Sequence, residues 1–188
     1  LQVGRAMAEE AVAGAPLSEV PLERPFGIPG AGSMVEDPDE AAWASVRNLT
    51  SAAFAADFNA RKGEYILLDI EVDNVSGDER VSGVWQRNPD GRGWASYRNL
   101  TSSGFSERWR EYREAGYRLI DQESYVLDGA RYYAGIWIEN LEQYDWASYR
   151  NLTSSQFATY AEQFDDTHVL VDFEAYDVGG EIRYAGAW

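Results

Sequence analysis

A nine-residue string that occurs three times constrains the fold of this chain more than any other feature. It reads Trp-Ala-Ser-Tyr-Arg-Asn-Leu-Thr-Ser at residues 94–102 and at residues 146–154, and a close copy with Val46 in place of tyrosine stands at residues 43–51. Recurrence at a fixed period is typical of repeat architectures. The opening tryptophans lie 51 and 52 positions apart, so the repeating unit has about 51 residues.

The second half of each unit has a constant length. An Asp-x-Glu pair is followed by a closing tryptophan, 16 positions after the aspartate in every unit, whereas 26, 27 and 26 positions separate the opening tryptophan from that aspartate. This constancy predicts a fixed strand–turn–strand segment, with the variation in length in or after a helix. The acidic pairs are Asp69/Glu71, Asp121/Glu123 and Asp172/Glu174, and the closing tryptophans are Trp85, Trp137 and Trp188.

Composition indicates a folded chain and excludes some classes of partner. Of the 188 residues 45% are hydrophobic, which is typical of a globular protein, and the chain has no cysteine for a disulfide or a thiolate metal site. The net charge of −16 argues against binding to nucleic acid or to an anionic membrane surface. No apolar run approaches the roughly 18 residues of a membrane-spanning helix, so we expect no membrane insertion.

The first part of the chain differs from the rest. Residues 1–42 contain five of the six prolines, with glycines between them. Proline removes backbone donors and disfavours helix in the residue before it, so this segment is predicted to be an extended N-terminal linker or a strap.

Each unit has the pattern strand, helix, strand, strand. The nine-residue string starts with a strand and ends in a threonine suited to cap a helix, and Thr153 with Gln156 forms a capping-box pattern. Gly63 and Gly116 are predicted to end the first two helices. Residues 66–72 alternate with a period of two, and glycine marks the turn between the last two strands. In the third unit the pattern places Val169, Val171, Phe173 and Ala175 on the buried face.

We therefore predict an α+β fold of three tandem β-α-β-β repeats, with antiparallel strands and one helix per repeat. Unit 1 spans residues 43–93, unit 2 residues 94–145 and unit 3 residues 146–188. A unit of this size cannot bury its own faces, so the units either stack or close with pseudo-threefold symmetry.

The opening string and the closing Tyr-Ala-Gly-x-Trp together resemble the bacterial tandem repeat domain. That repeat also occurs in the amino-terminal region of fungal polyglycine hydrolases, secreted endopeptidases whose catalytic half is β-lactamase-like. The resemblance covers about residues 43–188 and implies an accessory module with no settled chemistry of its own. Unit 1 departs from the pattern at Val46 and at Val81-Ser82, where tyrosine and alanine are usual.

The residues themselves do not provide a hydrolytic site. Lys62 is the only lysine and Asn59 stands three positions before it, so the Ser-x-x-Lys motif of β-lactamase-like enzymes is absent. His168 is the only histidine, and it occupies the position that holds Tyr65 and Tyr117 in the other units, which favours a packing role.

The acidic pairs have two interpretations. Asp and Glu two positions apart on a strand project from one face. They either form structural ion pairs with the arginine that recurs once per unit, or they bind a cation, with calcium at Asp121 and Glu123 as the candidate site. The ion-pair interpretation matches Arg47, Arg98 and Arg150 with the acids of the three units.

The tryptophans and the Asn-Leu-Thr triplets each have two interpretations as well. Tryptophans at the unit edges are predicted to form an aromatic seam between units, and the alternative is an exposed platform for sugar or peptide. Asn48, Asn99 and Asn151 fit the glycosylation pattern, but hydrogen bonding at the strand exit explains them too. The seam residues are Trp43, Trp85, Trp94, Trp137, Trp146 and Trp188.

From these observations we expect a non-catalytic module of a secreted protein, outside the cell or in its envelope, that binds or scaffolds through a protein or polysaccharide partner. No cofactor is expected. Two alternatives remain open. The chain could be the accessory region of a secreted β-lactamase-like serine hydrolase, or a calcium-dependent binding module.

Overall fold

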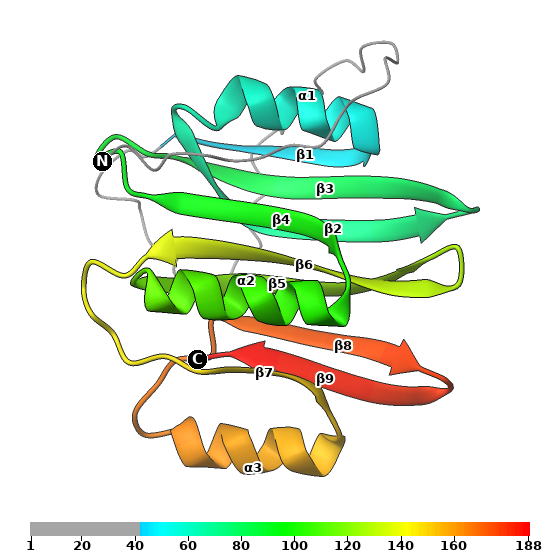
Figure 1. Cartoon of the computed structure of the whole chain (residues 1–188), viewed down its shortest axis with the longest axis vertical. Coiled ribbons are helices and arrows are strands. Elements are labelled where there is room, and N and C mark those ends of the chain that lie inside the picture. Colours follow the sequence, from blue (N-terminus) through cyan, green and yellow to red (C-terminus); the bar gives the residue numbers. More distant parts are fainter. Residues whose placement is uncertain (1–41) are drawn as a thin grey trace, which may run out of the picture.

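The computed structural model describes residues 42–188 and contains three β-α-β-β units in succession (Figure 1). Each unit forms a three-stranded antiparallel sheet with its last strand in the middle, in the orders β1-β3-β2, β4-β6-β5 and β7-β9-β8. The predicted fold class is confirmed, whereas the predicted linker lies almost wholly outside the described residues. The strands are β1 (Trp43–Thr50), β2 (Tyr65–Val75), β3 (Asp78–Arg87), β4 (Trp94–Leu100), β5 (Tyr117–Leu127), β6 (Ala130–Glu139), β7 (Ser148–Leu152), β8 (Asp172–Val178) and β9 (Glu181–Ala187), and the helices are α1 (Ser51–Arg61), α2 (Ser102–Glu114) and α3 (Ser154–Phe164).

The Asn-Leu-Thr triplet turns the first strand of each unit into its helix. Thr50, Thr101 and Thr153 each accept a hydrogen bond from a backbone N–H of the first helical turn, and Thr153 with Gln156 completes the predicted capping box. The asparagine two residues earlier has a φ of +55° to +58° in all three units. Asparagine tolerates this left-handed conformation better than most residues, so the triplet has a backbone role.

The helix ends are less regular than their starts. Gly116 follows α2 with a φ of +83°, as predicted for a terminating glycine. The prediction for Gly63 is wrong, because α1 ends at Lys62 in a right-handed conformation and Gly63 does not adopt a positive φ. The glycines of the strand–strand turns do adopt it, at Gly77, Gly129, Gly179 and Gly180.

The strand that carries the acidic pair departs from simple alternation. The register against the middle strand shifts between Leu67 and Asp69 in unit 1, so Leu67 and Ile70 both reach the core. In unit 3 the predicted buried face is wrong. Val169 and Val171 precede β8 and are 75% and 50% exposed, and Phe173 and Ala175 on β8 are exposed too.

The core on the helix side of unit 1 is closed by unit 2. A Cβ on Gly135 would lie 2.9 Å from Phe105 of α2, so that side of β6 faces its own helix. Ala134 and Ile136 alternate with Gly135 and therefore project from the helix-free face. Both are fully buried in the core of unit 1, beside Leu67.

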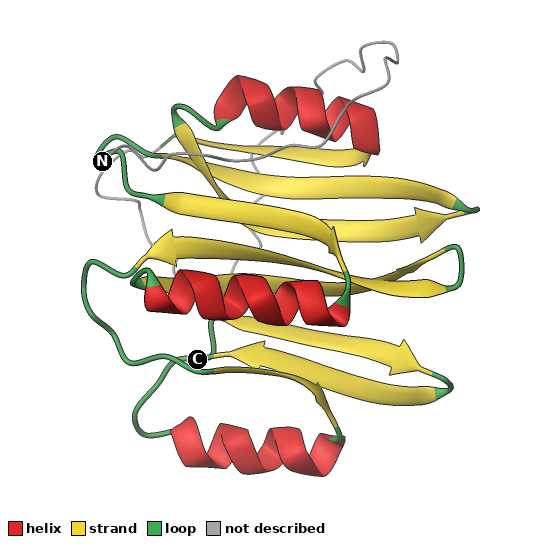
Figure 2. Cartoon of the chain, in the orientation of Figure 1, coloured by secondary structure: helices red, strands yellow, loops and turns green. Residues whose placement is uncertain are grey.

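Unit 3 closes the core of unit 2 in the same way. Ala187 of β9 is fully buried in a cluster with Phe105, Leu119 and Trp137 of unit 2. The edge strand β2 lies against β5 and β6, and the edge strand β5 lies against β8 and β9. The units therefore follow one another from the top to the bottom of Figure 1, and each sheet carries its helix on one side only (Figure 2).

The opening tryptophans lie at the boundaries between units. The Trp94 ring is 5.5 Å from Phe58 of unit 1, and the Trp146 ring is 5.4 Å from Trp109 of unit 2. Trp43 has no earlier unit beside it among the described residues and is 62% exposed. The closing tryptophans are buried in the cores.

We predict that Trp94→Ala lowers the free energy of unfolding by about 3 kcal/mol, because it removes a large ring from a packed boundary. Trp43→Ala is the matched control, since the same position in unit 1 is exposed, and it should cost less than about 1 kcal/mol. Urea denaturation followed by circular dichroism measures both. Equal losses for the two variants would contradict this assignment.

Candidate functional site

Acidic side chains from all three units meet along the edge strands β2, β5 and β8. Glu71, Glu123 and Glu174 lie on β2, β5 and β8, and each offers a carboxylate oxygen within 4.8 Å of the others. Asp121 and Glu123 stand opposite Ile136 and Ala134 on β6, which places them on the helix-free face. The aspartates Asp69, Asp121 and Asp172 form a second tier beside the glutamates.

Desolvation and mutual repulsion raise the pKa values of these carboxyl groups, of which Asp121 and Glu123 are buried and Glu71 is exposed. Desolvation, followed by repulsion from neighbouring acids, raises the pKa of Glu71 to about 8. Desolvation is also the main cause for Glu123, whose pKa rises to about 8, and for Asp172 and Glu174, whose pKa values rise to about 7. Asp121 is the most deeply buried, and its pKa lies well above the usual range for the same reason.

The predicted ion pairs between the recurrent arginines and these acids are wrong. Arg98 binds Glu79 at 2.5 Å, not Asp121 or Glu123, and Arg150 donates to the Ser102 carbonyl oxygen at 2.8 Å, not to Asp172 or Glu174. In the described part of the chain Arg47 has no hydrogen bond or ion pair to Asp69 or Glu71. The arginines lie on the opening strands, which are separated from the acidic strands by the middle strand of each sheet.

Arg98 and Arg150 instead hold units 2 and 3 to the unit before each of them. The Arg98 guanidinium lies 5.7 Å from the centre of the Phe54 ring of α1. The Arg150 guanidinium lies 4.6 Å from Phe105 and 4.5 Å from Tyr133, both in unit 2. The same position thus makes the same kind of cation–π contact across two successive boundaries.

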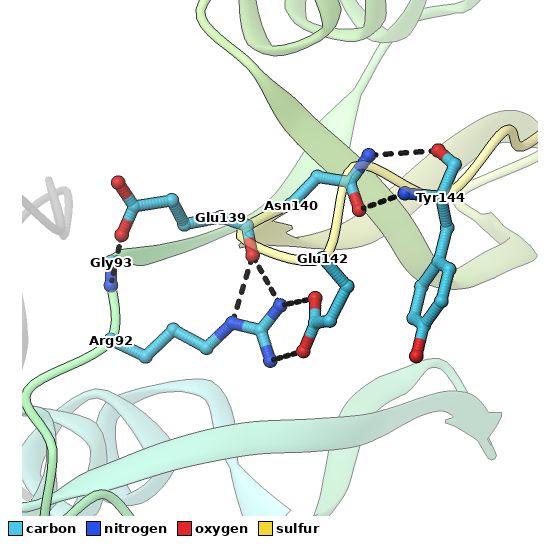
Figure 3. Close-up of polar contacts among 6 residues, drawn as sticks. All are labelled: Arg92, Gly93, Glu139, Asn140, Glu142 and Tyr144. Atoms are coloured by element: carbon cyan, nitrogen blue, oxygen red, sulfur yellow. Dashed lines mark hydrogen bonds and ion pairs between the residues drawn. The ribbon is translucent and has the colours of Figure 1, made fainter.

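The connections between units are joined as well (Figure 3). Arg92, in the connection after unit 1, donates from Nε to the Glu139 carbonyl oxygen at 2.8 Å and pairs through both terminal nitrogens with Glu142. Asn140 bonds the backbone of Tyr144 with both its oxygen and its nitrogen, which shapes the second connection. The two hydrogen bonds from the Arg92 guanidinium to the Glu142 carboxylate hold the connection after unit 1 against the connection after unit 2.

His168 does not form part of a catalytic constellation among the described residues. Its Nδ1 lies 2.7 Å from the Thr167 hydroxyl, and its ring packs edge-on against Phe164 at 4.9 Å.

A depression of about 420 Å³ lies between the hairpins of units 2 and 3, lined by Tyr125, Arg131 and Tyr176.

The helix-side core of unit 3 is open. Leu170 is 41% exposed, whereas Leu67 and Leu119 at the same position of units 1 and 2 are 0% and 2% exposed. Phe173 is 50% exposed, and Ile70 at the same position of unit 1 is 2% exposed. The open aromatic face is formed by Phe157, Leu170, Phe173 and Tyr184, whose three rings lie 5.2 to 6.0 Å apart.

Comparison with known proteins identifies the repeats. The family described as "Polyglycine hydrolase-like, structural repeat" matches residues 40–88, 91–140 and 144–188, which are the three units in turn. The chain belongs to this structural repeat family. No significant match was found among curated proteins or among solved structures. The membership fixes the repeat architecture.

The family repeat explains the departure of unit 1 from the pattern. Ser82 stands where units 2 and 3 carry Ala134 and Ala185, and Gln86 stands where unit 2 carries Ile138. No earlier unit covers that face among the described residues, and a repeat array needs polar residues on its outer face. The difference at Ser82 is visible in the sequence, but the face on which Ser82 lies follows only from the structure.

Within the described repeats, no helix is both long and apolar enough to cross a membrane.

The raised pKa values predict how stability depends on pH. When the pKa of an acid is higher in the folded chain, the unfolded chain releases its proton first, so stability is greatest below about pH 4.5 and falls as pH rises towards 8. In buffer free of divalent cations, the melting temperature should fall between pH 5 and pH 8.

Glu123→Gln should reduce this loss of stability by roughly 2 kcal/mol, because it removes one titrating carboxyl from the cluster. Thermal melts of both proteins across this range make the measurement, with Glu181→Gln, whose side chain is 70% exposed, as the control. A melting temperature that rises with pH through this range would refute the assignment.

Proposed function

We propose that this chain is a non-catalytic scaffolding module that binds protein through the open aromatic face of unit 3. The observation that carries the proposal is the contrast between equivalent positions. Leu67 and Leu119 are buried by the next unit, and Leu170 is exposed. A group of adjoining apolar side chains that is open to solvent is typical of an interaction site.

The internal boundaries indicate which surface would fit. Units 1 and 2 are each covered by a helix-free sheet face, together with an opening strand that carries a tryptophan and an arginine. Unit 1 carries Trp43 and Arg47 at these positions. The partner that we propose is therefore a second copy of this chain, docked head-to-tail through its unit 1.

In this arrangement Arg47 of one copy lies over Phe157 and Tyr184 of the other, as Arg150 lies over Phe105 and Tyr133 within the chain. Because the two contacting surfaces differ, the contact is heterologous. Further copies add head-to-tail until the assembly closes into a ring. Ser82 and Gln86 make the unit 1 face more polar than its counterparts, so the association is expected to be weaker than the internal boundaries and reversible.

A second candidate follows from the family description, which names a polyglycine hydrolase. The module would then be the accessory region of a secreted β-lactamase-like hydrolase, acting outside the cell or in its envelope. A segment with a Ser-x-x-Lys motif in the same gene would favour this candidate. Both candidates give the repeats themselves a non-catalytic role.

The assembly is tested by sedimentation velocity over a range of concentrations. We expect the parent chain to self-associate and Phe173→Ser and Arg47→Ala each to be monomeric. A mixture of these two variants should form a dimer, because each retains the face that the other has lost. Val75→Ser is the control, since Val75 is 48% exposed at the hairpin of unit 1, and it should associate like the parent. A parent that stays monomeric, or variants that associate unchanged, would sink the proposal.

The non-catalytic role is tested separately. We expect the purified chain to hydrolyse neither a simple ester, nor a β-lactam, nor a glycine-rich peptide, because the described residues give Lys62 and His168 only Asn59 and Thr167 as side-chain hydrogen-bond partners. Turnover above background that disappears when one residue is changed would show that the repeats are catalytic.

A further inference from the structure

The three central glutamates have the spacing of ligands around a large divalent cation. Glu71, Glu123 and Glu174 each offer one oxygen, and these oxygens lie within 4.8 Å of one another. Oxygen ligands of calcium stand 2.3–2.6 Å from the ion, so two of them can be up to about 5 Å apart. Magnesium gives up its water reluctantly and is seldom bound by a dedicated set of protein carboxylates, which favours calcium here.

Beside these glutamates stands a buried acid with one oxygen that has no hydrogen-bond partner. Asp121 is 6% exposed, projects from the same face of β5 as Glu123, and its Oδ2 has no hydrogen-bond partner among the described residues. The charged groups that act on Asp121 are Asp69, Asp172, Glu123 and Glu174, all of them acids. A buried carboxylate without a donor or a positive partner is costly, and a bound cation would offset that cost.

The neighbouring strands supply no positive charge to this cluster. The groups that face the three glutamates are Asp69 and Asp73 of β2, Asp121 of β5 and Asp172 of β8. Two of the recurrent arginines, Arg98 and Arg150, are held by the preceding units through Glu79 and Ser102. Glu123 lies between Glu71 and Glu174 and is within hydrogen-bonding reach of both.

We propose that Glu71, Glu123 and Glu174 bind one calcium ion that links the three units. Each ligand comes from a different unit, so the ion joins parts of the chain that are about 50 residues apart in sequence. Second carboxylate oxygens and water complete the six to eight ligands that calcium prefers. The site is independent of the head-to-tail assembly, because it lies within one chain.

The test is calorimetric titration of the whole chain with calcium chloride at pH 7.5, together with thermal melts in calcium and in EDTA. We expect one ion per chain and a rise in melting temperature of about 5 °C at saturating calcium. Glu123→Gln should weaken binding at least tenfold and lose the rise, whereas Glu181→Gln should behave as the parent.

Glu123→Gln also shows whether loss of binding reflects misfolding. In EDTA at pH 7.5 its melting temperature should equal or exceed that of the parent, because a neutral amide removes repulsion from the cluster. Magnesium should bind at least tenfold more weakly than calcium. No heat and no shift with millimolar calcium would mean that the cluster holds protons only, and an unchanged Glu123→Gln titration would place the ion elsewhere. Either result, or magnesium binding as tight as calcium, would overturn the proposal.

Discussion

The structure depends on the covering of each unit's helix-side core by the helix-free face of the next unit. One helix on a three-stranded sheet leaves the edge of its core open to water, and a chain segment of about 50 residues has too little apolar surface to close it alone. Ala134, Ile136 and Ala187 supply the missing surface to units 1 and 2. The arginine and tryptophan of the opening strand extend the same contact to the helix of the preceding unit.

This way of packing brings acidic residues together. The face that covers the preceding core also carries the Asp-x-Glu pair, so three pairs converge when three units are joined. Their raised pKa values record the resulting cost of desolvation and repulsion. The charge of the cluster therefore destabilises the packing between units that the apolar contacts stabilise. At neutral pH, protons or a cation must offset this charge.

Because the core of each unit is covered by the next unit, the two ends of the described array differ. Unit 1 turns a face with Ser82 and Gln86 outwards, whereas unit 3 leaves Leu170 and Phe173 exposed. One end is thus closed by polar substitutions and the other remains apolar. This difference, and not any catalytic constellation among the described residues, is the feature of the surface that supports a binding role.

The sequence by itself determined the repeat, the order of elements and the helix starts, because these follow from local spacing, capping and turn chemistry within one unit. It did not determine the partners of Arg98 and Arg150, since equal copy number says nothing about which unit an arginine reaches. Nor did it predict that Val169, Val171 and Phe173 are exposed, because their alternation matches that of the buried strands. Only the tertiary structure decided the arginine partners and the exposure of these unit 3 residues. Both depend on contacts between units, where the edge of one sheet meets the face of the next. These contacts join residues about 50 positions apart, and no local sequence pattern encodes them.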